Sequence, residues 1–258
     1  MSGKTRQVNS LSYLIRATFS TNEMKNHLHS ALRNQKAVLF DVGGTLVHPD
    51  WSRLAELVEA ETGLLFAPAQ MHAAFYAMLK VIDDELKAGV NSRRGREPHW
   101  VFVDTLRSLG IEEAKCLRIR TRFATAHQER HLWCVPDSDA SNVLQRLKDA
   151  GLRIAVISNT EDGRVRESLA LAALASHFEL IIDSHLVGCS KPDKAIFQFA
   201  LTRLGLEPQE AAYVGDSYGY DVIGARSAGL SPILLDRMDA YKSETGLIRI
   251  RMLSELVG

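Results

Sequence analysis

Short, continuous apolar runs alternate with amphipathic stretches along most of the chain. The runs are AVLFD, RIAVIS, ELIID, YVGD and ILLD, at 37–41, 153–158, 179–183, 213–216 and 233–236. Between the later runs, residues 142–151 and 195–205 show helical spacing of apolar side chains and end at glycine. Continuous apolar strands separated by helices indicate a parallel sheet that is covered on both faces. We therefore predict an α/β fold with a doubly wound parallel sheet.

The first two runs are separated by about 110 residues, far more than a crossover helix needs. Most of this interval has helical apolar spacing, interrupted by turn signals. The helical stretches are 52–63, 70–89, 101–110 and 112–131. We predict a helical cap at 51–132, inserted into an α/β core of 36–50 and 133–258, and an N-terminal extension at 1–35.

Composition narrows the possible partners and compartments. The 258 residues include 31 basic and 31 acidic side chains, so no overall field favours nucleic acid or an anionic membrane. No apolar run approaches the roughly 20 residues that cross a bilayer, and the three cysteines show no metal or disulfide spacing. A cytoplasmic protein is expected. Residues 1–22 have no acidic residue and resemble an organelle-targeting peptide weakly, with a plain polar extension as the alternative.

Polar residues stand where the predicted strands end. In an open parallel sheet the ligand lies outside the carboxyl ends of the strands, so these residues are candidates for chemistry. Asp41 is followed by glycines that let backbone N–H groups approach an anion. Ser158 precedes Asn159, a short polar donor, and Lys191 precedes a proline that starts a helix.

The last such segment is VGDSYGYD, in which Asp216 ends a strand and Asp221 follows five positions later. Two carboxylates on one loop suit a hard cation. Each of these four signals is common when it stands alone.

Together the motifs resemble the haloacid dehalogenase-like superfamily of aspartate-nucleophile hydrolases. The matching segments, in order, are FDVGGTL, VISNT, SKPD and GDSYGYDVIGARSAG, and the similarity extends from about residue 36 to the end of the chain. The tail RIRMLSELVG is similar to the final strand and helix of the family, and the helical insert resembles its cap.

The resemblance implies a role for each position. Asp41 would attack phosphorus and carry an aspartyl-phosphate. Mg²⁺ would be held by Asp41, the carbonyl of Gly43, Asp216 and Asp221. Ser158 and Lys191 would bind the phosphoryl oxygens, with Gly44, Thr45 and Asn159 as further substrate-binding positions.

One position departs from the phosphatase pattern. Phosphatases of this family usually carry a second Asp two residues after the nucleophile, as the general acid and base, whereas this chain has Gly43. General acid-base help contributes about 10²–10⁴-fold in rate. A phosphatase could move its proton through His48, Asp50, a cap residue or a water for which Gly43 leaves room.

Two alternatives to a phosphatase remain. Dehalogenases of the family carry an aromatic residue at this position and need no metal. Phosphonate-cleaving members have a small residue there but use an early cap lysine, and residues 50–79 contain none. A catalytically weak member that binds a phosphorylated ligand or a protein partner is the other alternative.

The predicted cap supplies candidates for substrate selection. Residues 91–100, NSRRGREPHW, include Arg96, which we take as a candidate for binding a second anionic group; a solvated loop is the alternative. His72 and Tyr76 share a helical face that either looks into the site or packs on other helices. His127, Arg130 and His131 could be surface charges at a helix end. The expected substrate is a small phosphorylated metabolite, and the oligomeric state is unspecified.

Overall fold

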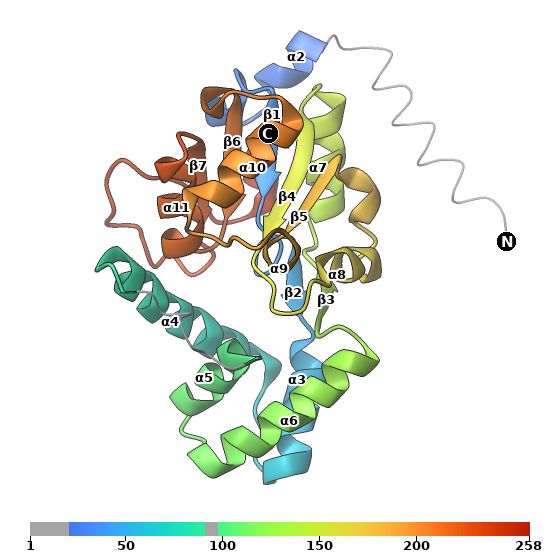
Figure 1. Cartoon of the computed structure of the whole chain (residues 1–258), viewed down its shortest axis with the longest axis vertical. Coiled ribbons are helices and arrows are strands. Elements are labelled where there is room, and N and C mark those ends of the chain that lie inside the picture. Colours follow the sequence, from blue (N-terminus) through green and yellow to red (C-terminus); the bar gives the residue numbers. More distant parts are fainter. Residues whose placement is uncertain (1–20, 91–97) are drawn as a thin grey trace, which may run out of the picture.

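A computed structural model describes residues 21–90 and 98–258 of the chain. Six parallel strands form the central sheet in the order β5-β4-β1-β6-β7-β8 (Figure 1). They are β1 (Ala37–Phe40), β4 (Arg153–Ser158), β5 (Leu180–Asp183), β6 (Ala211–Gly215), β7 (Ser231–Leu235) and β8 (Ile248–Ile250). The predicted strand positions are confirmed, as is the α/β fold class.

Helices cover both faces of the sheet, as its continuous apolar strands require. Val38 and Phe40 of β1 pack toward α7 and α8, whereas Leu39 packs toward α10 and α11. The core helices are α7 (Ala140–Asp149), α8 (Val165–Leu171), α9 (Ser184–Val187), α10 (Lys194–Leu204) and α11 (Gly224–Ser227). Alternate residues of one buried strand therefore face opposite layers, which is the doubly wound arrangement.

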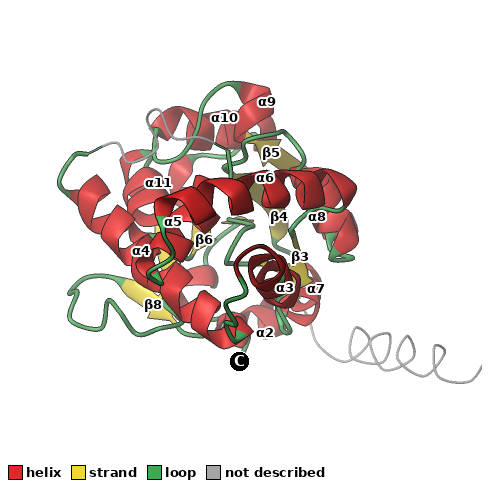
Figure 2. Cartoon of the chain, turned by 90° about the horizontal axis from the view of Figure 1, so that it is seen from below, coloured by secondary structure: helices red, strands yellow, loops and turns green. Residues whose placement is uncertain are grey.

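Four helices are inserted between β1 and β4 and form a separate layer below the sheet in Figure 1. They are α3 (Trp51–Thr62), α4 (Pro68–Lys87), α5 (Trp100–Ser108) and α6 (Glu113–Glu129), and we call them the helical insert. The insert has its own apolar cluster, which includes Leu54, Phe102 and Phe123. Figure 2 shows the insert from below, covering the sheet.

A two-stranded antiparallel ribbon joins the insert to the core. It is formed by β2 (Val47–Pro49) and β3 (Trp133–Pro136). Both chain crossings between the layers run through this ribbon, so its residues lie next to the end of β1. The sequence pattern did not indicate it, because three or four residues that include a proline show no alternation.

The N-terminal part of the described chain packs on the core. Helix α2 (Thr21–Asn26) is followed by Leu28 and Leu32, which are buried in the same cluster as Phe40. The proposed targeting segment, residues 1–22, lies almost entirely outside the described residues. None of the helices in the described ranges has the length and apolar character needed to cross a membrane.

Candidate active site

Four charged side chains meet at the carboxyl end of β1, where the strand order reverses direction. Lys191 Nζ lies 2.5 Å from Asp41 Oδ1 and 2.7 Å from Asp221 Oδ1, and it also donates to Tyr213 Oη at 3.0 Å. Asp41, Asp216 and Asp221 offer carboxylate oxygens that all lie within 4.8 Å of one another. Three of the four strand-end positions indicated by the sequence, Asp41, Lys191 and Asp216, are therefore joined with Asp221 in one cluster.

Burial and like charge determine the electrostatics of this cluster. Burial raises the pKa of Asp41 to about 6, with Asp221 adding to the shift and Lys191 opposing it. Burial, together with the carboxylates of Asp41 and Asp221, raises the pKa of Asp216 well above its usual range. Burial alone would lower the pKa of Lys191, but Asp221 and Asp41 raise it. One ammonium group thus faces three buried carboxyls, so the cluster would carry an excess of negative charge with all three ionised, which is why the pKa of Asp216 is raised.

The residues present fit a hard divalent cation. Among the described residues, Asp216 Oδ2 is a buried oxygen without a hydrogen-bond partner, although buried polar atoms are normally paired. It belongs to a set of oxygen donors, the ligand type that Mg²⁺ prefers. Asp221 is less available, because one oxygen accepts from Lys191 and Tyr213 and the other from the amide of Ser217 at 3.0 Å. Asp41 and Asp216 are thus the better-placed carboxylate ligands.

Gly44 lets the loop after β1 pass directly over Asp216. Its φ is +87°, and a Cβ built there would lie 2.0 Å from Asp216 Oδ2. An L side chain would be strained at this φ and would also clash, so this glycine is required by close approach. Its carbonyl accepts hydrogen bonds from Tyr76 Oη at 3.2 Å and from Arg237 Nε at 3.3 Å.

The Lys191 backbone is fixed by the loop after β4. Asn159 Nδ2 donates to the Lys191 carbonyl at 3.0 Å, and the Lys191 amide donates to Asn159 Oδ1 at 2.9 Å. Asn159 therefore positions the lysine backbone, and it also lines the cavity described below. Ser158 is buried at the end of β4 and lines the same cavity as Asp41 and Lys191.

A cavity of about 480 Å³ extends from the carboxylate cluster into the helical insert. Its deep end is formed by Asp41, Ser158, Lys191 and Asp216. Its outer walls carry large apolar side chains of the insert and of β3, namely Phe75, Leu79, Ile82, Trp100, Phe102 and Trp133. The arrangement combines a polar reaction end with an aromatic chamber, as in many small-molecule sites.

Trp133 occupies the space beside Gly43. A Cβ at position 43 would lie 3.2 Å from Cζ3 and 3.3 Å from Cε3 of the indole. A side chain at position 43 would therefore be in tight contact with the indole. The indole is held by ring contacts to Phe75 and Phe102 from the insert. Sequence could not have revealed this neighbour, which lies 90 positions along the chain.

Three predicted residues near Asp41 do not line the cavity. His48 Nε2 lies 3.3 Å from Asp137, on the β2–β3 ribbon. Asp50 caps helix α3 by accepting from the amide of Arg53 at 3.1 Å. Thr45 is fully buried. The proposed proton carriers His48 and Asp50 thus have local structural partners, and Arg96 lies outside the described residues.

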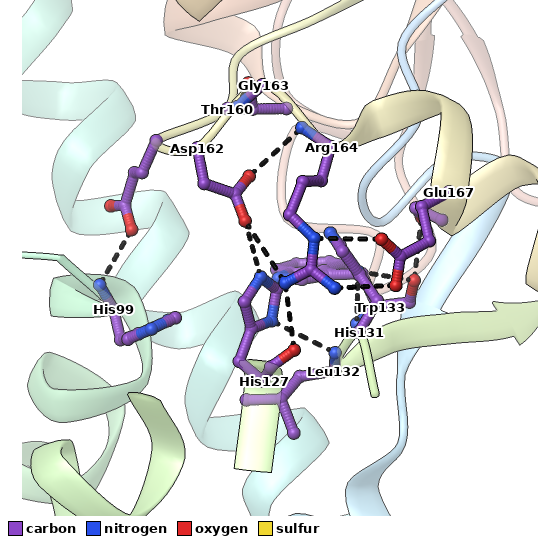
Figure 3. Close-up of polar contacts among 12 residues, drawn as sticks. His99, His127, His131, Leu132, Trp133, Thr160, Asp162, Gly163, Arg164 and Glu167 are labelled. Atoms are coloured by element: carbon purple, nitrogen blue, oxygen red, sulfur yellow. Dashed lines mark hydrogen bonds and ion pairs between the residues drawn. The ribbon is translucent and has the colours of Figure 1, made fainter. Parts of the chain in front are cut away.

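A row of histidines forms one wall of the cavity (Figure 3). The ring centroids of His99 and His127 are 5.0 Å apart, and those of His127 and His131 are 4.3 Å apart. His127 and His131 are buried, so the interpretation of these two as surface charges was wrong. Burial lowers the pKa of both His99 and His131 to about 4, which makes them neutral hydrogen-bonding groups near pH 7.

Hydrogen bonds assign one tautomer to His127. Its Nδ1 accepts from the Leu132 amide at 3.2 Å, so its Nε2 carries the proton and donates to Asp162 at 2.8 Å (Figure 3). Although His127, His131 and Asp162 could be grouped as metal ligands, both ring nitrogens of His127 are already engaged. The group is better described as a contact between the insert and the loop after β4. Arg164 supports it by donating to the His127 carbonyl at 3.0 Å.

Helix α4 supplies two further contacts that sequence reasoning left open or missed. Tyr76, which lies on the helical face shared with His72, reaches the loop after β1. Asp83 is 1% exposed and bonds to the loop that carries Asp216 and Asp221. A signal for Asp83 existed in the sequence, because it stands on the apolar face of its helix, four residues after Leu79 and three before Leu86.

The geometry can be compared with known proteins. A family model described as haloacid dehalogenase-like hydrolase matches residues 35–229. Phosphoserine phosphatase from Thermus thermophilus is 35% identical over 53% of this chain and 53% of its own length. Glyceraldehyde 3-phosphate phosphatase from Methanothermobacter thermautotrophicus is 30% identical over 78% of this chain and 85% of its own. The chain spans little more than half the length of the first curated relatives it matches, 59% and 53%.

A dehalogenase is also among the relatives. (S)-2-haloacid dehalogenase 4A from Burkholderia cepacia is 29% identical over 78% of this chain and 83% of its own length. Among solved structures, the HAD-hydrolase YfnB from Bacillus subtilis, bound to magnesium, superimposes with a TM-score of 0.64 at 19% identity. That alignment covers 86% of this chain and 97% of the other, and it shows a shared fold.

Proposed function

The chain belongs to the haloacid dehalogenase-like hydrolases, and on that premise we propose that it is a magnesium-dependent phosphatase of a small phosphate monoester. The observation that carries this proposal is the buried Asp216 carboxylate, whose Oδ2 has no hydrogen-bond partner in the described part of the chain and which lies within 4.8 Å of two further carboxylates. A hydrolase that used only a carboxylate nucleophile would have no need for this excess of buried negative charge. A cation bound there would offset it.

The residues take these roles in the proposed reaction. A carboxylate oxygen of Asp41 attacks phosphorus, forming an Asp–O–P bond as the P–O bond to the leaving group breaks. Water then attacks the phosphorus of the aspartyl-phosphate, which releases phosphate and restores Asp41. Lys191 offsets the repulsion between Asp41 and the substrate, and with Ser158 it orients the phosphoryl oxygens.

Magnesium fits Asp41, Asp216 and the Gly43 carbonyl, with Asp221 bracing the loop. When bound, it would supply Lewis-acid stabilisation of charge on the phosphoryl group. The chain's own contribution is to exclude bulk water from this end of the cavity and to hold Asp41 ionised beside Lys191. Asn159 fixes the backbone from which Lys191 reaches in.

Proton transfer to the leaving group is the step that this chain handles differently. Gly43 offers no proton, and Trp133 lies 3.2 Å from the point at which a side chain at this position would begin. The cavity histidines His99 and His131 have a pKa of about 4, so they are poor proton donors at neutral pH. We therefore propose that the enzyme favours esters whose leaving group needs little protonation, such as aryl phosphates, over alkyl phosphates.

The aromatic ring beside the nucleophile favours a second candidate, a carbon–halogen hydrolase. Dehalogenases of the family carry an aromatic residue at the position of Gly43, and here Trp133 provides one from another part of the chain. One relative is named as a dehalogenase of 2-haloacids. The metal-suited carboxylates argue for the phosphatase, because the dehalogenases need no metal.

A substrate panel separates these candidates. The purified protein is assayed with 4-nitrophenyl phosphate, O-phosphoserine, glyceraldehyde 3-phosphate and (S)-2-chloropropionate, each with Mg²⁺ and with EDTA. The proposal predicts phosphate release that requires Mg²⁺ and no chloride release. Chloride release that EDTA leaves unchanged would overturn it in favour of the dehalogenase, and no turnover at all would favour a ligand-binding member.

A further inference from the structure

Asp83 is a buried carboxylate of the insert that bonds to a core loop with both of its oxygens. Oδ1 accepts from Ser217 Oγ at 2.5 Å and from the Gly219 amide at 2.7 Å. Oδ2 accepts from the Tyr218 amide at 2.8 Å and from Tyr241 Oη at 2.5 Å. Burial raises the pKa of Asp83, which the four donors oppose. All four donors belong to the core, and three of them come from one short loop.

The helix itself gives no reason for a carboxylate at this position. Asp83 stands on α4 next to Ile82, which with Phe75 and Leu79 belongs to an apolar cluster. A charge buried in such surroundings is costly unless it is fully hydrogen-bonded, and an isolated helix does not require it. The hydrogen bonds of Asp83 to Ser217, Tyr218 and Gly219 therefore explain why a carboxylate is present on this helix.

That loop carries two of the three carboxylates of the reaction end. It runs from Asp216 into the short π-helical turn Tyr218–Ile223, which contains Asp221, and its internal bonds link it to Asp83. The Ser217 amide donates to Asp221 Oδ2 at 3.0 Å, while Ser217 Oγ donates to Asp83 and accepts from the Tyr220 amide at 3.0 Å. Moving Asp83 would therefore shift Ser217 and, through it, the carboxylates on either side.

Gly219 brings the helix and the loop into direct contact. A Cβ at this position would lie 2.5 Å from Leu86 Cδ1 and 3.0 Å from Asp83 Oδ1. Helix α4 makes a second contact two turns earlier, where Tyr76 Oη donates to the Gly44 carbonyl at 3.2 Å. Helix α4 thus contacts the segment after β1 and the segment after β6, at Gly44 and Gly219.

We propose that Asp83 is a positioning residue through which docking of helix α4 sets the geometry, and hence the affinity, of the cation site at Asp41 and Asp216. The inference rests on the metal requirement of the proposed function. By linkage, the coupling is reciprocal, so that bound Mg²⁺ stabilises the docked helix by the same free energy with which the docked helix stabilises Mg²⁺.

The test measures Mg²⁺ binding directly, by titration calorimetry on the full-length chain without substrate. Asp83→Asn keeps the size and shape of the side chain. Its NH₂ group, however, would face donors of the core that now bond to a carboxylate oxygen. We expect the Kd for Mg²⁺ to rise about 10–100-fold, the usual effect of losing an outer-shell partner. Tyr241→Phe removes one of the four donors and keeps the charge of Asp83, so we expect a smaller rise in the Kd for Mg²⁺. This variant replaces Asp83→Asn as the test if Asp83→Asn does not fold.

Two matched controls separate positioning from general effects. Asp84→Asn removes one charge from the next, exposed residue of α4, whose carboxylate pairs with Lys80. His127→Asn weakens the other contact between insert and core, at the loop after β4. Both controls should retain the wild-type Kd for Mg²⁺.

Hydrogen exchange adds a readout that a purely structural role would not change. In the wild type, Mg²⁺ should slow exchange of the Tyr218 and Gly219 amides, and Asp83→Asn should abolish this protection. A folded Asp83→Asn variant with wild-type Mg²⁺ affinity would overturn the proposal, as would equal weakening by His127→Asn. If the wild type binds Mg²⁺ but hydrolyses no ester, the proposed function fails, and the effect of Asp83→Asn on Mg²⁺ affinity still decides this inference. If the wild type does not bind Mg²⁺, the proposed function and this inference are both overturned.

Discussion

The indole of Trp133 lies against the backbone of Gly43, so that a Cβ at this glycine would begin 3.2 Å from the ring. Gly43 lies in the loop after β1, before the insert, and Trp133 lies in β3, after it. The position at which other phosphatases carry a catalytic acid is thus bordered by an indole. The ring is buttressed by Phe75 at 5.8 Å and Phe102 at 5.6 Å between centroids. The effect of any side chain introduced at position 43 therefore depends on the residue at position 133.

The first prediction concerns restoring the acid. Gly43→Asp alone should have little benefit, because a Cβ at this position already lies 3.2 Å from Trp133 and the indole must yield to admit a carboxylate. Gly43→Asp combined with Trp133→Ala should raise kcat/KM for an alkyl phosphate relative to the Trp133→Ala parent, by up to about 10²-fold, and for an aryl phosphate much less. Steady-state kinetics on both esters checks this. An equal gain on both would show that proton transfer is not the missing function.

The second prediction concerns the buried Asp216. Asp216→Asn removes a carboxyl whose pKa burial and its neighbours raise, so the metal-free protein should gain about 1–2 kcal/mol in unfolding free energy. The variant should lose the stabilisation by Mg²⁺, which for the wild type is about 2.7 kcal/mol at 100 times Kd. Urea unfolding with and without Mg²⁺ measures both changes. A variant that Mg²⁺ still stabilises fully would contradict the assignment.

The third prediction concerns the support of Lys191. Asn159→Ala deletes two hydrogen bonds to the lysine backbone, at 2.9 and 3.0 Å. Because small misplacements of a catalytic group cost up to about 10²-fold in rate, we expect kcat to fall about 10–100-fold. Asn142→Ala, at an exposed position on α7, is the matched control and should keep wild-type kcat. Unchanged turnover by Asn159→Ala would show that Lys191 is held by its ion pairs alone.

The fourth prediction concerns pH and the contact between His127 and Asp162. Burial opposes ionisation of Asp162, but the hydrogen bond from His127 lowers its pKa to about 2. A depressed carboxyl pKa gives stability that is complete above the unfolded pKa of about 3.9 and is lost as pH falls toward 2. Allowing for partial exposure, Asp162→Asn should cost about 1–2 kcal/mol at pH 7.

The pH dependence provides the check. In urea unfolding, the difference between wild type and Asp162→Asn should shrink to about half its neutral value by pH 3. A difference that stays constant between pH 7 and pH 3 would mean that the carboxylate charge of Asp162 does not provide the stabilisation.

The sheet was predictable because its strands are buried on both faces. Runs such as RIAVIS, residues 153–158, carry an unbroken apolar pattern that only a covered parallel strand explains, and β4 spans the same residues. The helices of the insert were also predicted, since the amphipathic spacing is long and regular. Ribbon strands β2 and β3 were not predicted, because pairing of such short segments is decided by distant residues.

The reaction end was predictable for a related reason. Strand ends in a parallel sheet converge, so Asp41 and Asp216 could be grouped before any geometry was known. Lys191 joins them from the segment between α9 and α10, where no strand ends. Contacts between the insert and the core could not be derived in this way. Trp133 beside Gly43, the burial of His127 and the bonds of Asp83 all depend on how one layer packs on the other.

The central claim is that Asp41 is the nucleophile of a magnesium-dependent phosphatase. It is tested most directly by steady-state hydrolysis of 4-nitrophenyl phosphate, with Mg²⁺ and with EDTA, by the wild type and by Asp41→Asn. The predicted result is turnover that needs Mg²⁺ and falls at least about 10³-fold in a variant that still folds. Turnover that Asp41→Asn retains, or that EDTA does not reduce, would contradict the claim.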